Sequence, residues 1–174
     1  MKTRYAIVSL FTCLCGSAFA QNPKTDMQFA TTAAKGGIAE VALGRMAATK
    51  AQDAGVKKFG QRMVTDHTKA NDELNAAARE DGVTIPQGLS EEHKGDAARL
   101  SSLEGAEFDK AYMKLMVSDH EEDVALFEKE ANTGKDTNVK AFAQKTLPVL
   151  KEHLQMAKDI QQRVGDSPQI SKGD

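Results

Sequence analysis

Four ionisable side chains stand alone on otherwise apolar helical stripes of this sequence. His67, His120 and His153 each lie among small or apolar residues that recur at steps of three and four. Glu40 is the only ionisable member of a fourth stripe, which consists of Ala and Gly residues. Residues at this spacing share one face of a helix, and each of the four lies near the middle of its stripe. Facing helices in a bundle would therefore bring the Glu and the three His residues to one level.

Imidazole and carboxylate groups are ligands of Fe, Zn, Cu or Mn, and bundles build metal sites from inward-facing side chains. We therefore predict a site for one transition-metal ion at this level. The predicted ligands are Glu40, His67, His120 and His153. Asp66 and Asp119 each precede a His residue and point about 100° around the helix from it. They would act as flanking ligands, orient a neighbouring imidazole, or face solvent.

A carboxylate-bridged iron pair would need a different set of residues. Such sites use Glu-x-x-His on two helices, but the residues three positions before the His residues are Val64, Val117 and Leu150. A single metal ion or a His-rich mixed site fits these residues better than an iron pair does. A metal-free alternative stays open, in which neutral imidazoles share hydrogen bonds with carboxylates as a structural or pH-sensitive polar layer. Haem binding by His and Met residues is a third alternative.

The four stripes belong to long helical segments, since no segment alternates apolar and polar residues over a strand's length. The predicted helices run from an Asp26 cap to Asp53, from Val56 to Asp81, from Ala106 to Asn132, and from an Asp136 cap to Val164. Residues 82–105 form a long crossover with a short helix from Ser90 to Leu103, in which His93 is expected to be exposed. The predicted fold is all-α: a ferritin-like four-helix bundle of two antiparallel hairpins joined by this crossover.

The first twenty residues have the pattern of an export signal. Lys2 and Arg4 precede an apolar run over residues 5–15, and Ala18-Phe19-Ala20 has the small-x-small pattern of a cleavage site. We predict a cleavable signal peptide at residues 1–20, a helical bundle domain at 21–165 and a disordered tail at 166–174. The predicted location is a bacterial periplasm. No transmembrane segment is expected, because no segment approaches the roughly 20 apolar residues that a span needs.

Composition excludes several classes of function. The 174 residues carry a net charge of −2, and removal of residues 1–20 takes away two cationic residues, no acidic residue and both Cys residues. The resulting charge of −4 argues against nucleic acid as a partner, because phosphate binding needs a basic surface. The mature chain cannot form a Cys-based zinc site. It has no phosphate-binding loop and no nucleophile motif, so we assign no catalytic or cofactor-binding residue and favour a protein that is not an enzyme.

Five motifs follow one another between about Met27 and Ile160. They are Gly36-Gly37-Ile38-Ala39-Glu40, Arg62-Met63-Val64-Thr65-Asp66-His67, Gly105-Ala106-Glu107-Phe108-Asp109-Lys110-Ala111-Tyr112, Ser118-Asp119-His120, and Lys145-Thr146-Leu147-Pro148 leading to Glu152-His153. In these motifs and their order the chain resembles the bacterial exported family labelled domain of unknown function 4142. The resemblance implies a ferritin-like bundle, export and a loose association with stress responses. It supplies no assigned activity.

These observations lead to one main hypothesis and one alternative from a different class. The main hypothesis is an exported helical protein that binds a transition-metal ion in its core and serves metal handling or stress protection. The alternative is a non-enzymatic envelope stress or interaction protein that acts through its surface, with a His cluster that is structural. The sequence leaves open the identity of the metal, any substrate, a protein partner and whether the chain forms a homo-oligomer.

Overall fold

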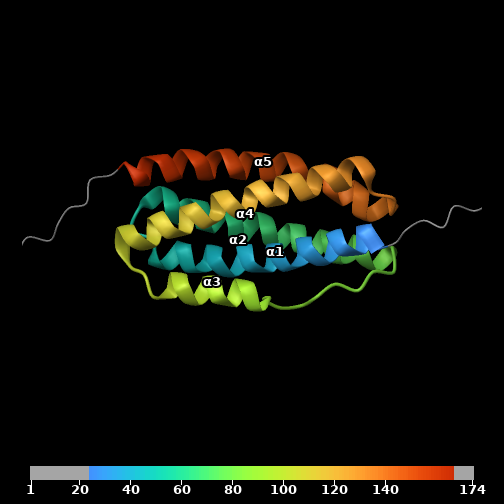
Figure 1. Ribbon diagram of the computed structural model, residues 1–174, viewed down its shortest axis with the longest axis horizontal. Coiled ribbons are helices and arrows are strands. Elements are labelled where there is room, and N and C mark those ends of the chain that lie inside the picture. Colours follow the sequence, from blue (N-terminus) through green and yellow to red (C-terminus); the bar gives the residue numbers. More distant parts are fainter. Residues whose placement is uncertain (1–23, 167–174) are drawn as a thin grey trace, which may run out of the picture.

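The computed structural model describes residues 24–166, which form helices and no strand (Figure 1). The helices are α1 (Lys24–Lys50), α2 (Ala54–Glu80), α3 (Glu91–Ser101), α4 (Gly105–Thr133) and α5 (Thr137–Gly165). The all-α prediction is confirmed, and the four long helices lie within a few residues of their predicted bounds. The expected signal peptide at residues 1–20 lies outside the described residues, as does the expected tail from residue 167 onward.

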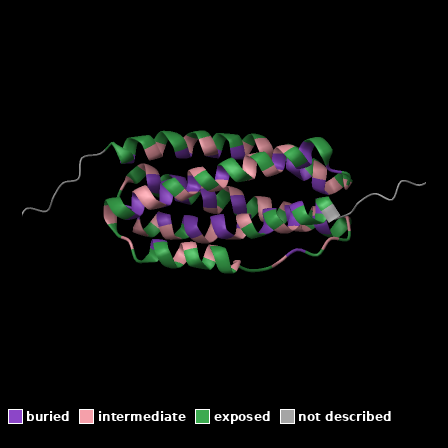
Figure 2. Cartoon of the chain, in the orientation of Figure 1, coloured by how far each residue is buried: buried purple, intermediate pink, exposed green. Residues whose placement is uncertain are grey.

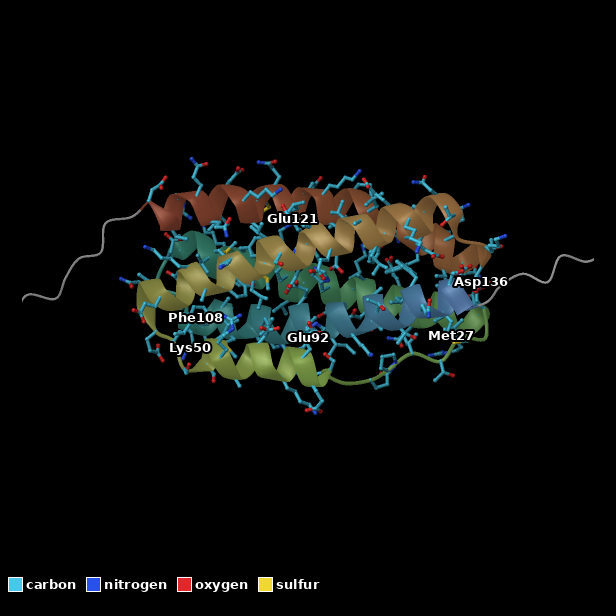
Figure 3. All side chains as sticks on the ribbon, viewed as in Figure 1. Met27, Lys50, Glu92, Phe108, Glu121 and Asp136 are labelled. Atoms are coloured by element: carbon cyan, nitrogen blue, oxygen red, sulfur yellow. The ribbon has the colours of Figure 1, made fainter. Side chains whose placement is uncertain are left out.

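The four long helices pack into one bundle. α1 packs most extensively against α2, and α4 against α5, while contacts of α2 with α5 and of α1 with α4 complete the bundle. α3 lies on the outside, against α1 and α4 (Figure 1). Lys50 at the end of α1 contacts both the end of α3 and the start of α4. Its Nζ donates to the Ser101 carbonyl oxygen at 2.8 Å and to Glu104 Oε1 at 2.6 Å, and it lies 6.0 Å from the Phe108 ring centroid (Figure 3).

Of the two predicted helix caps, the one at Asp26 is wrong and the one at Asp136 is confirmed in position only. Asp26 lies inside the first turn of α1, which begins at Lys24, so it is not the N-cap of that helix. Asp136 occupies the N-cap position of α5 but makes no hydrogen bond there through its side chain. The caps that do form are Asp53 before α2, which accepts from the Gly55 and Val56 amides, and Ser90 before α3, which accepts from the His93 amide. Each of these side chains satisfies amides that the first helical turn leaves unpaired.

Buried residues face the middle of the bundle along all four long helices (Figure 2). They form two apolar clusters, one around Phe29, Phe127 and Phe142, and the other around Phe59 and Tyr112. The His and Glu residues of the predicted site belong to neither cluster, although all of them are buried. A polar layer therefore separates the two halves of the apolar core.

α1 and α2 approach each other closely at Gly44 and Gly60. A Cβ atom on Gly44 would lie 2.7 Å from the Gly60 carbonyl oxygen, and one on Gly60 would lie 2.7 Å from the Gly44 carbonyl oxygen. Backbone atoms at that distance cannot move aside without shifting a helix, so both positions require a residue without a side chain. This contact fixes the spacing of the two helices one turn away from the polar layer.

None of the helices described is long and apolar enough to cross a membrane.

Candidate metal centre

Three imidazole rings meet in the polar layer of the core. His67 on α2, His120 on α4 and His153 on α5 are 5%, 0% and 1% exposed. Their ring centroids lie 5.5–5.7 Å apart, and one ligand nitrogen from each lies within 4.8 Å of those of the other two. The predicted convergence of three His residues from three helices is confirmed. We refer to His67, His120 and His153 as the histidine cluster.

Hydrogen bonds fix the tautomers of two of these rings. Nδ1 of His120 lies 2.9 Å from the carbonyl oxygen of Met116. A carbonyl oxygen only accepts hydrogen bonds, so Nδ1 carries the proton and Nε2 keeps its lone pair. In His153, Nε2 donates to Asp66 Oδ2 at 2.8 Å, which leaves the lone pair on Nδ1. In both rings the nitrogen that is free to bind a metal ion is set by the partner of the other nitrogen.

One buried nitrogen in each ring has no hydrogen-bond partner among the described residues. These atoms are His67 Nε2, His120 Nε2 and His153 Nδ1. Buried polar atoms are nearly always paired, because an unpaired one loses its hydration without compensation. Three nitrogens in one cluster are thus left without a partner by the protein itself.

The histidine cluster is uncharged at neutral pH. Burial, followed by the neighbouring His120 and His153, lowers the pKa of His67 to about 3. Burial and then His153 lower the pKa of His120 to about 4. Burial also lowers the pKa of His153, although the hydrogen bond to Asp66 acts in the opposite direction. Neutral imidazole is the form that binds metal ions.

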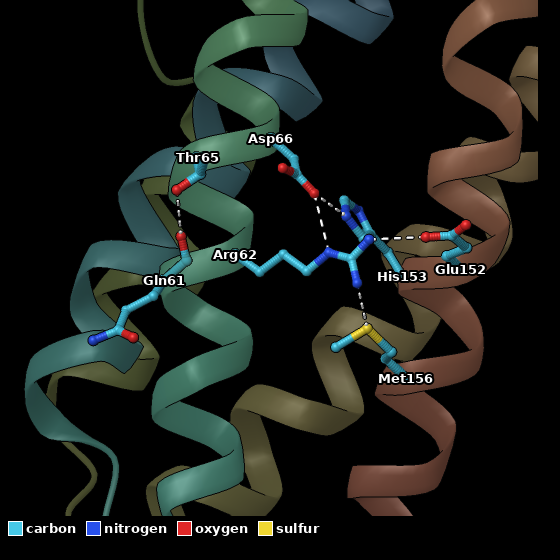
Figure 4. A network of polar contacts seen from close by, with 7 residues as sticks. All are labelled: Gln61, Arg62, Thr65, Asp66, Glu152, His153 and Met156. Atoms are coloured by element: carbon cyan, nitrogen blue, oxygen red, sulfur yellow. Dashed lines mark hydrogen bonds and ion pairs between the residues drawn. The ribbon is translucent and has the colours of Figure 1, made fainter.

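Asp66 holds His153 from the flank of the histidine cluster (Figure 4). Its Oδ2 also accepts from Arg62 Nε at 3.1 Å, and Arg62 reaches Glu152 Oε2 at 2.9 Å and the Met156 sulfur at 3.0 Å. Burial raises the pKa of Asp66, but the hydrogen bonds from His153 and Arg62 outweigh it and keep this pKa below its ordinary value. Of the roles predicted for Asp66, the geometry matches orientation of a neighbouring imidazole.

Arg62 is the member of this network that the sequence analysis did not identify. Its spacing of four residues from Asp66 is the signal that could have revealed it, because such residues are neighbours on a helix surface.

Glu40 lies beside His120 but outside the histidine cluster. It is 2% exposed, and its Oε1 lies 3.7 Å from His120 Nδ1, which is the protonated nitrogen. The lone pair that is free to bind a metal is on Nε2, at the other edge of the ring. Burial, followed by Asp123 and Asp119, raises the pKa of Glu40 well above its ordinary value. The raised pKa favours the neutral carboxyl form of Glu40, which lies near His120 but makes no hydrogen bond to it.

Asp119 faces a different cavity from the one beside the histidine cluster. It is half-buried and lines a space between α1, α3 and α4 together with Glu40 and His93. Burial and the carboxylates of Asp96, Glu122 and Glu92 raise its pKa to about 7. His93, which was expected to be exposed, is half-buried in this cavity, and its Nδ1 is buried without a partner.

A cavity of about 270 Å³ leads to the histidine cluster from the side of α2 and α5. His67 and His153 line it, together with Asp66 and Arg62. Lys69 and Lys145 also contribute to its lining. Two of the three candidate ligands are therefore reached from one opening.

Comparison with known proteins gives a family and a fold. The family model described as Domain of unknown function (DUF4142) matches residues 15–160. Among solved structures, the crystal structure of a DUF305 fragment from Deinococcus radiodurans is similar with a TM-score of 0.70 at 15% sequence identity, over 80% of this chain and 96% of that chain. At this identity the similarity concerns the fold alone. A search of curated protein sequences finds no significant match.

Proposed function

This chain belongs to the family described as Domain of unknown function (DUF4142), and we propose that it binds one divalent transition-metal ion through the histidine cluster. Two observations carry the proposal: one ligand nitrogen from each of the three buried rings lies within 4.8 Å of those of the other two, and each ring has a buried nitrogen without a hydrogen-bond partner. His67 Nε2, His120 Nε2 and His153 Nδ1 would be the ligand atoms. Asp119 has no part in this site.

The surroundings of the histidine cluster suit a doubly charged ion. Three neutral imidazoles supply no negative charge, but Asp66 contacts His153 at 2.8 Å and Glu40 lies 3.7 Å from His120. The Asp66 carboxylate behind His153 would offset part of a charge of +2 and make that imidazole more basic. A bound cation would also lower the raised pKa of Glu40 and favour its ionised form. An all-imidazole ligand set favours Zn, Cu or Fe over Mn, which prefers oxygen ligands. Three protein ligands would leave a fourth position for water or a small substrate.

Export to the periplasm and a ferritin-like arrangement complete the proposal. The signal-peptide pattern of residues 1–20 supports export. The extensive pairing of α1 with α2 and of α4 with α5 supports two antiparallel hairpins joined by a crossover that carries α3. In that setting a buried metal ion would serve metal handling or protection against oxidative stress. The described surface favours this core site over a docking role, since Met27 is its only large apolar side chain that is exposed, at 46%.

Metal analysis of the purified protein tests the proposal. The wild-type protein, purified without chelator and equilibrated with Zn²⁺, Cu²⁺ or Fe²⁺, is expected to retain about one ion per chain after dialysis. The double variant His67→Ala/His120→Ala is expected to retain none. His93→Ala is the matched control, because His93 lies outside the histidine cluster, and it should leave the metal content unchanged. A wild-type protein that retains none of these ions would overturn the proposal.

A second pair of variants tests the role of Asp66. Asp66→Asn removes the carboxylate that accepts from His153 Nε2, and loss of such a partner lowers metal affinity by about 10- to 100-fold. Glu152→Gln is the matched control, because Glu152 contacts Arg62 and not His153. Competition with a chromogenic chelator gives both affinities. Equal losses in the two variants would exclude a specific role for Asp66.

A further inference from the structure

A second cavity, separate from the histidine cluster, lies between α1, α3 and α4. It has a volume of about 680 Å³ and is lined by six carboxylate residues. They are Glu40, Glu92, Asp96, Asp119, Glu122 and Asp123. Figure 3 labels Glu92, which α3 contributes to the lining of this cavity. We refer to this space as the acidic cavity.

The negative charge of the acidic cavity is poorly compensated. Lys35 is the only Lys or Arg residue in its lining. Arg99 pairs with Asp96 at 3.2 Å, but within residues 24–166 no salt bridge reaches the other five carboxylates except the contact of Glu40 with His120. Burial and the neighbouring Asp119 and Glu122 raise the pKa of Asp123 to about 7. A cavity lined by so many carboxylates and so few cationic side chains attracts cations.

An unpaired acceptor lies at the inner end of the acidic cavity. Glu40 is 2% exposed, its Oε1 is directed to His120, and its Oε2 has no hydrogen-bond partner. Nδ1 of His93 is a second buried atom on the wall of this cavity without a partner. Burial of such acceptors is costly unless a donor reaches them. A positively charged hydrogen-bond donor is a ligand that would satisfy such an acceptor and also offset the surrounding carboxylates.

The form of the acidic cavity suits an organic cation better than a bare metal ion. Within the described residues, the histidine cluster is the only group of three or more His, Cys, Asp or Glu residues whose ligand atoms all lie within 4.8 Å. The six carboxylates therefore do not converge on one point as metal coordination requires. A volume of about 680 Å³ is typical of a small-molecule pocket. Ala39, Leu115 and Leu126 add apolar patches to the wall, against which methylene groups can pack.

We propose that the acidic cavity binds an aliphatic polyamine, whose separated ammonium groups pair with the carboxylates while its methylene chain packs against Ala39, Leu115 and Leu126. One ammonium group donates to Glu40 Oε2 at the inner end. Others pair with Asp119 and Asp123, which α4 supplies, and with Glu92, which α3 supplies. Binding does not require a metal ion in the histidine cluster.

Calorimetric titration of the metal-free protein with spermidine tests this proposal. The test variant Glu122→Gln/Asp123→Asn removes two carboxylates of the acidic cavity. The control variant Glu121→Gln/Glu128→Gln removes the same charge from the same helix, but from residues that pair with Lys158 and Lys151 on α5. At about 150 mM salt, where long-range attraction is screened, the test variant is expected to bind spermidine roughly tenfold or more weakly. The control variant should stay within about threefold of wild type.

Three results would overturn polyamine binding. The first is no binding of spermidine to wild-type protein at about 1 mM ligand. The second is an equal loss of affinity in the test and control variants, which would indicate a general charge effect. The third is binding of Mg²⁺ or Mn²⁺ as tight as that of spermidine and equally weakened in the test variant, which would make the acidic cavity a metal site. Thermal unfolding of both double variants checks that each is folded, and weaker binding of butylamine than of spermidine would support the need for several ammonium groups.

Discussion

In the core histidines, the hydrogen-bond partner of one ring nitrogen decides which nitrogen keeps the lone pair. His120 gives its Nδ1 proton to the Met116 carbonyl and His153 gives its Nε2 proton to Asp66, so opposite nitrogens of the two rings are left with lone pairs. Both lone pairs are buried without a partner in the described structure. The same residue type therefore offers Nε2 in one case and Nδ1 in the other. The choice depends on local geometry and not on the residue itself.

The buried state of His67 has a measurable consequence for stability. Burial and its neighbours His120 and His153 lower its pKa from 6.5 to about 3 in the folded chain. Between these values the unfolded chain binds a proton that the folded chain does not, so the free energy of unfolding falls as the pH falls. His67→Gln removes this effect. Metal-free wild type is therefore expected to lose up to about 1.4 kcal/mol per pH unit relative to His67→Gln as the pH falls from about 6.5 to about 4.

Urea unfolding of both metal-free proteins at several pH values measures this difference, and the other titrating groups largely cancel between the two. A difference in unfolding free energy that stays constant over the acidic range would contradict a neutral, buried His67.

At the scale of elements, the position of the site depends on how closely α1 approaches α2. Gly44 and Gly60 meet through their backbones, and Met63, one turn further along α2, is fully buried in the same contact region. His67 follows Met63 by four residues and so lies on the same face of α2. The separation and rotation of α2 that the glycine contact permits thus determine where the His67 ring reaches the core.

Gly60→Ala is expected to destabilise the protein although Ala favours helix. The new Cβ would lie 2.7 Å from the Gly44 carbonyl oxygen and 2.8 Å from the Ala47 Cβ, which forces the two helices apart. We expect the free energy of unfolding to fall by about 1–3 kcal/mol. Gly95→Ala in α3 is the matched control, because nothing lies within 4 Å of its added Cβ, and it should stabilise by up to about 1 kcal/mol. Thermal or urea unfolding measures both, and equal effects would exclude a close contact at Gly60.

At the scale of the whole molecule, three Asp side chains join helices that are far apart in sequence. Asp26 of α1 accepts from the Lys135 and Asp136 amides, both at 2.6 Å, in the turn between α4 and α5. Asp109 of α4 accepts from two amides of the turn between α1 and α2. Asp81 accepts from the Val139 amide of α5 at 3.0 Å. Each hydrogen bond satisfies a backbone donor of a turn or of a helix start that is distant in sequence from the Asp, so these side chains fasten the ends of the bundle to one another.

Asp26→Ala is expected to cost about 2–4 kcal/mol of unfolding free energy, since it leaves two partly buried amides without an acceptor. Asp136→Ala is the matched control. Burial, Asp26 and Asp81 raise the pKa of Asp136, and its side chain makes no cap hydrogen bond, so at neutral pH its loss should be neutral or stabilising. Urea unfolding at constant pH compares the unfolding free energies of the two variants. A larger loss in Asp136→Ala than in Asp26→Ala would show that the Asp136 side chain stabilises α5 as its cap.

Which segments form helices, and that the three imidazoles meet at one height along the bundle, could both be predicted from the sequence. Apolar residues at steps of three and four specify a helix and its buried face, and a His at the middle of such a face on each of three helices has to reach the core of a bundle. The helix bounds followed for the same local reason, because Gly and Asp residues mark the turns between the long helices. Family membership also followed from local motifs.

The position of each carboxylate relative to the imidazole rings could be seen only in the tertiary structure. Periodicity placed Glu40 on the inward face of its helix, but the rotation and height of α1 against α4 put its oxygen beside the protonated Nδ1 of His120, 3.7 Å away. The packing of the helices also places Asp119 in the cavity beside α3. It brings Asp26 within hydrogen-bond distance of the Lys135 amide, 109 residues further along the chain. A repeat of 3.6 residues fixes which face of a helix is buried. It does not fix the axial shift and rotation between two helices, which the packing of both surfaces sets.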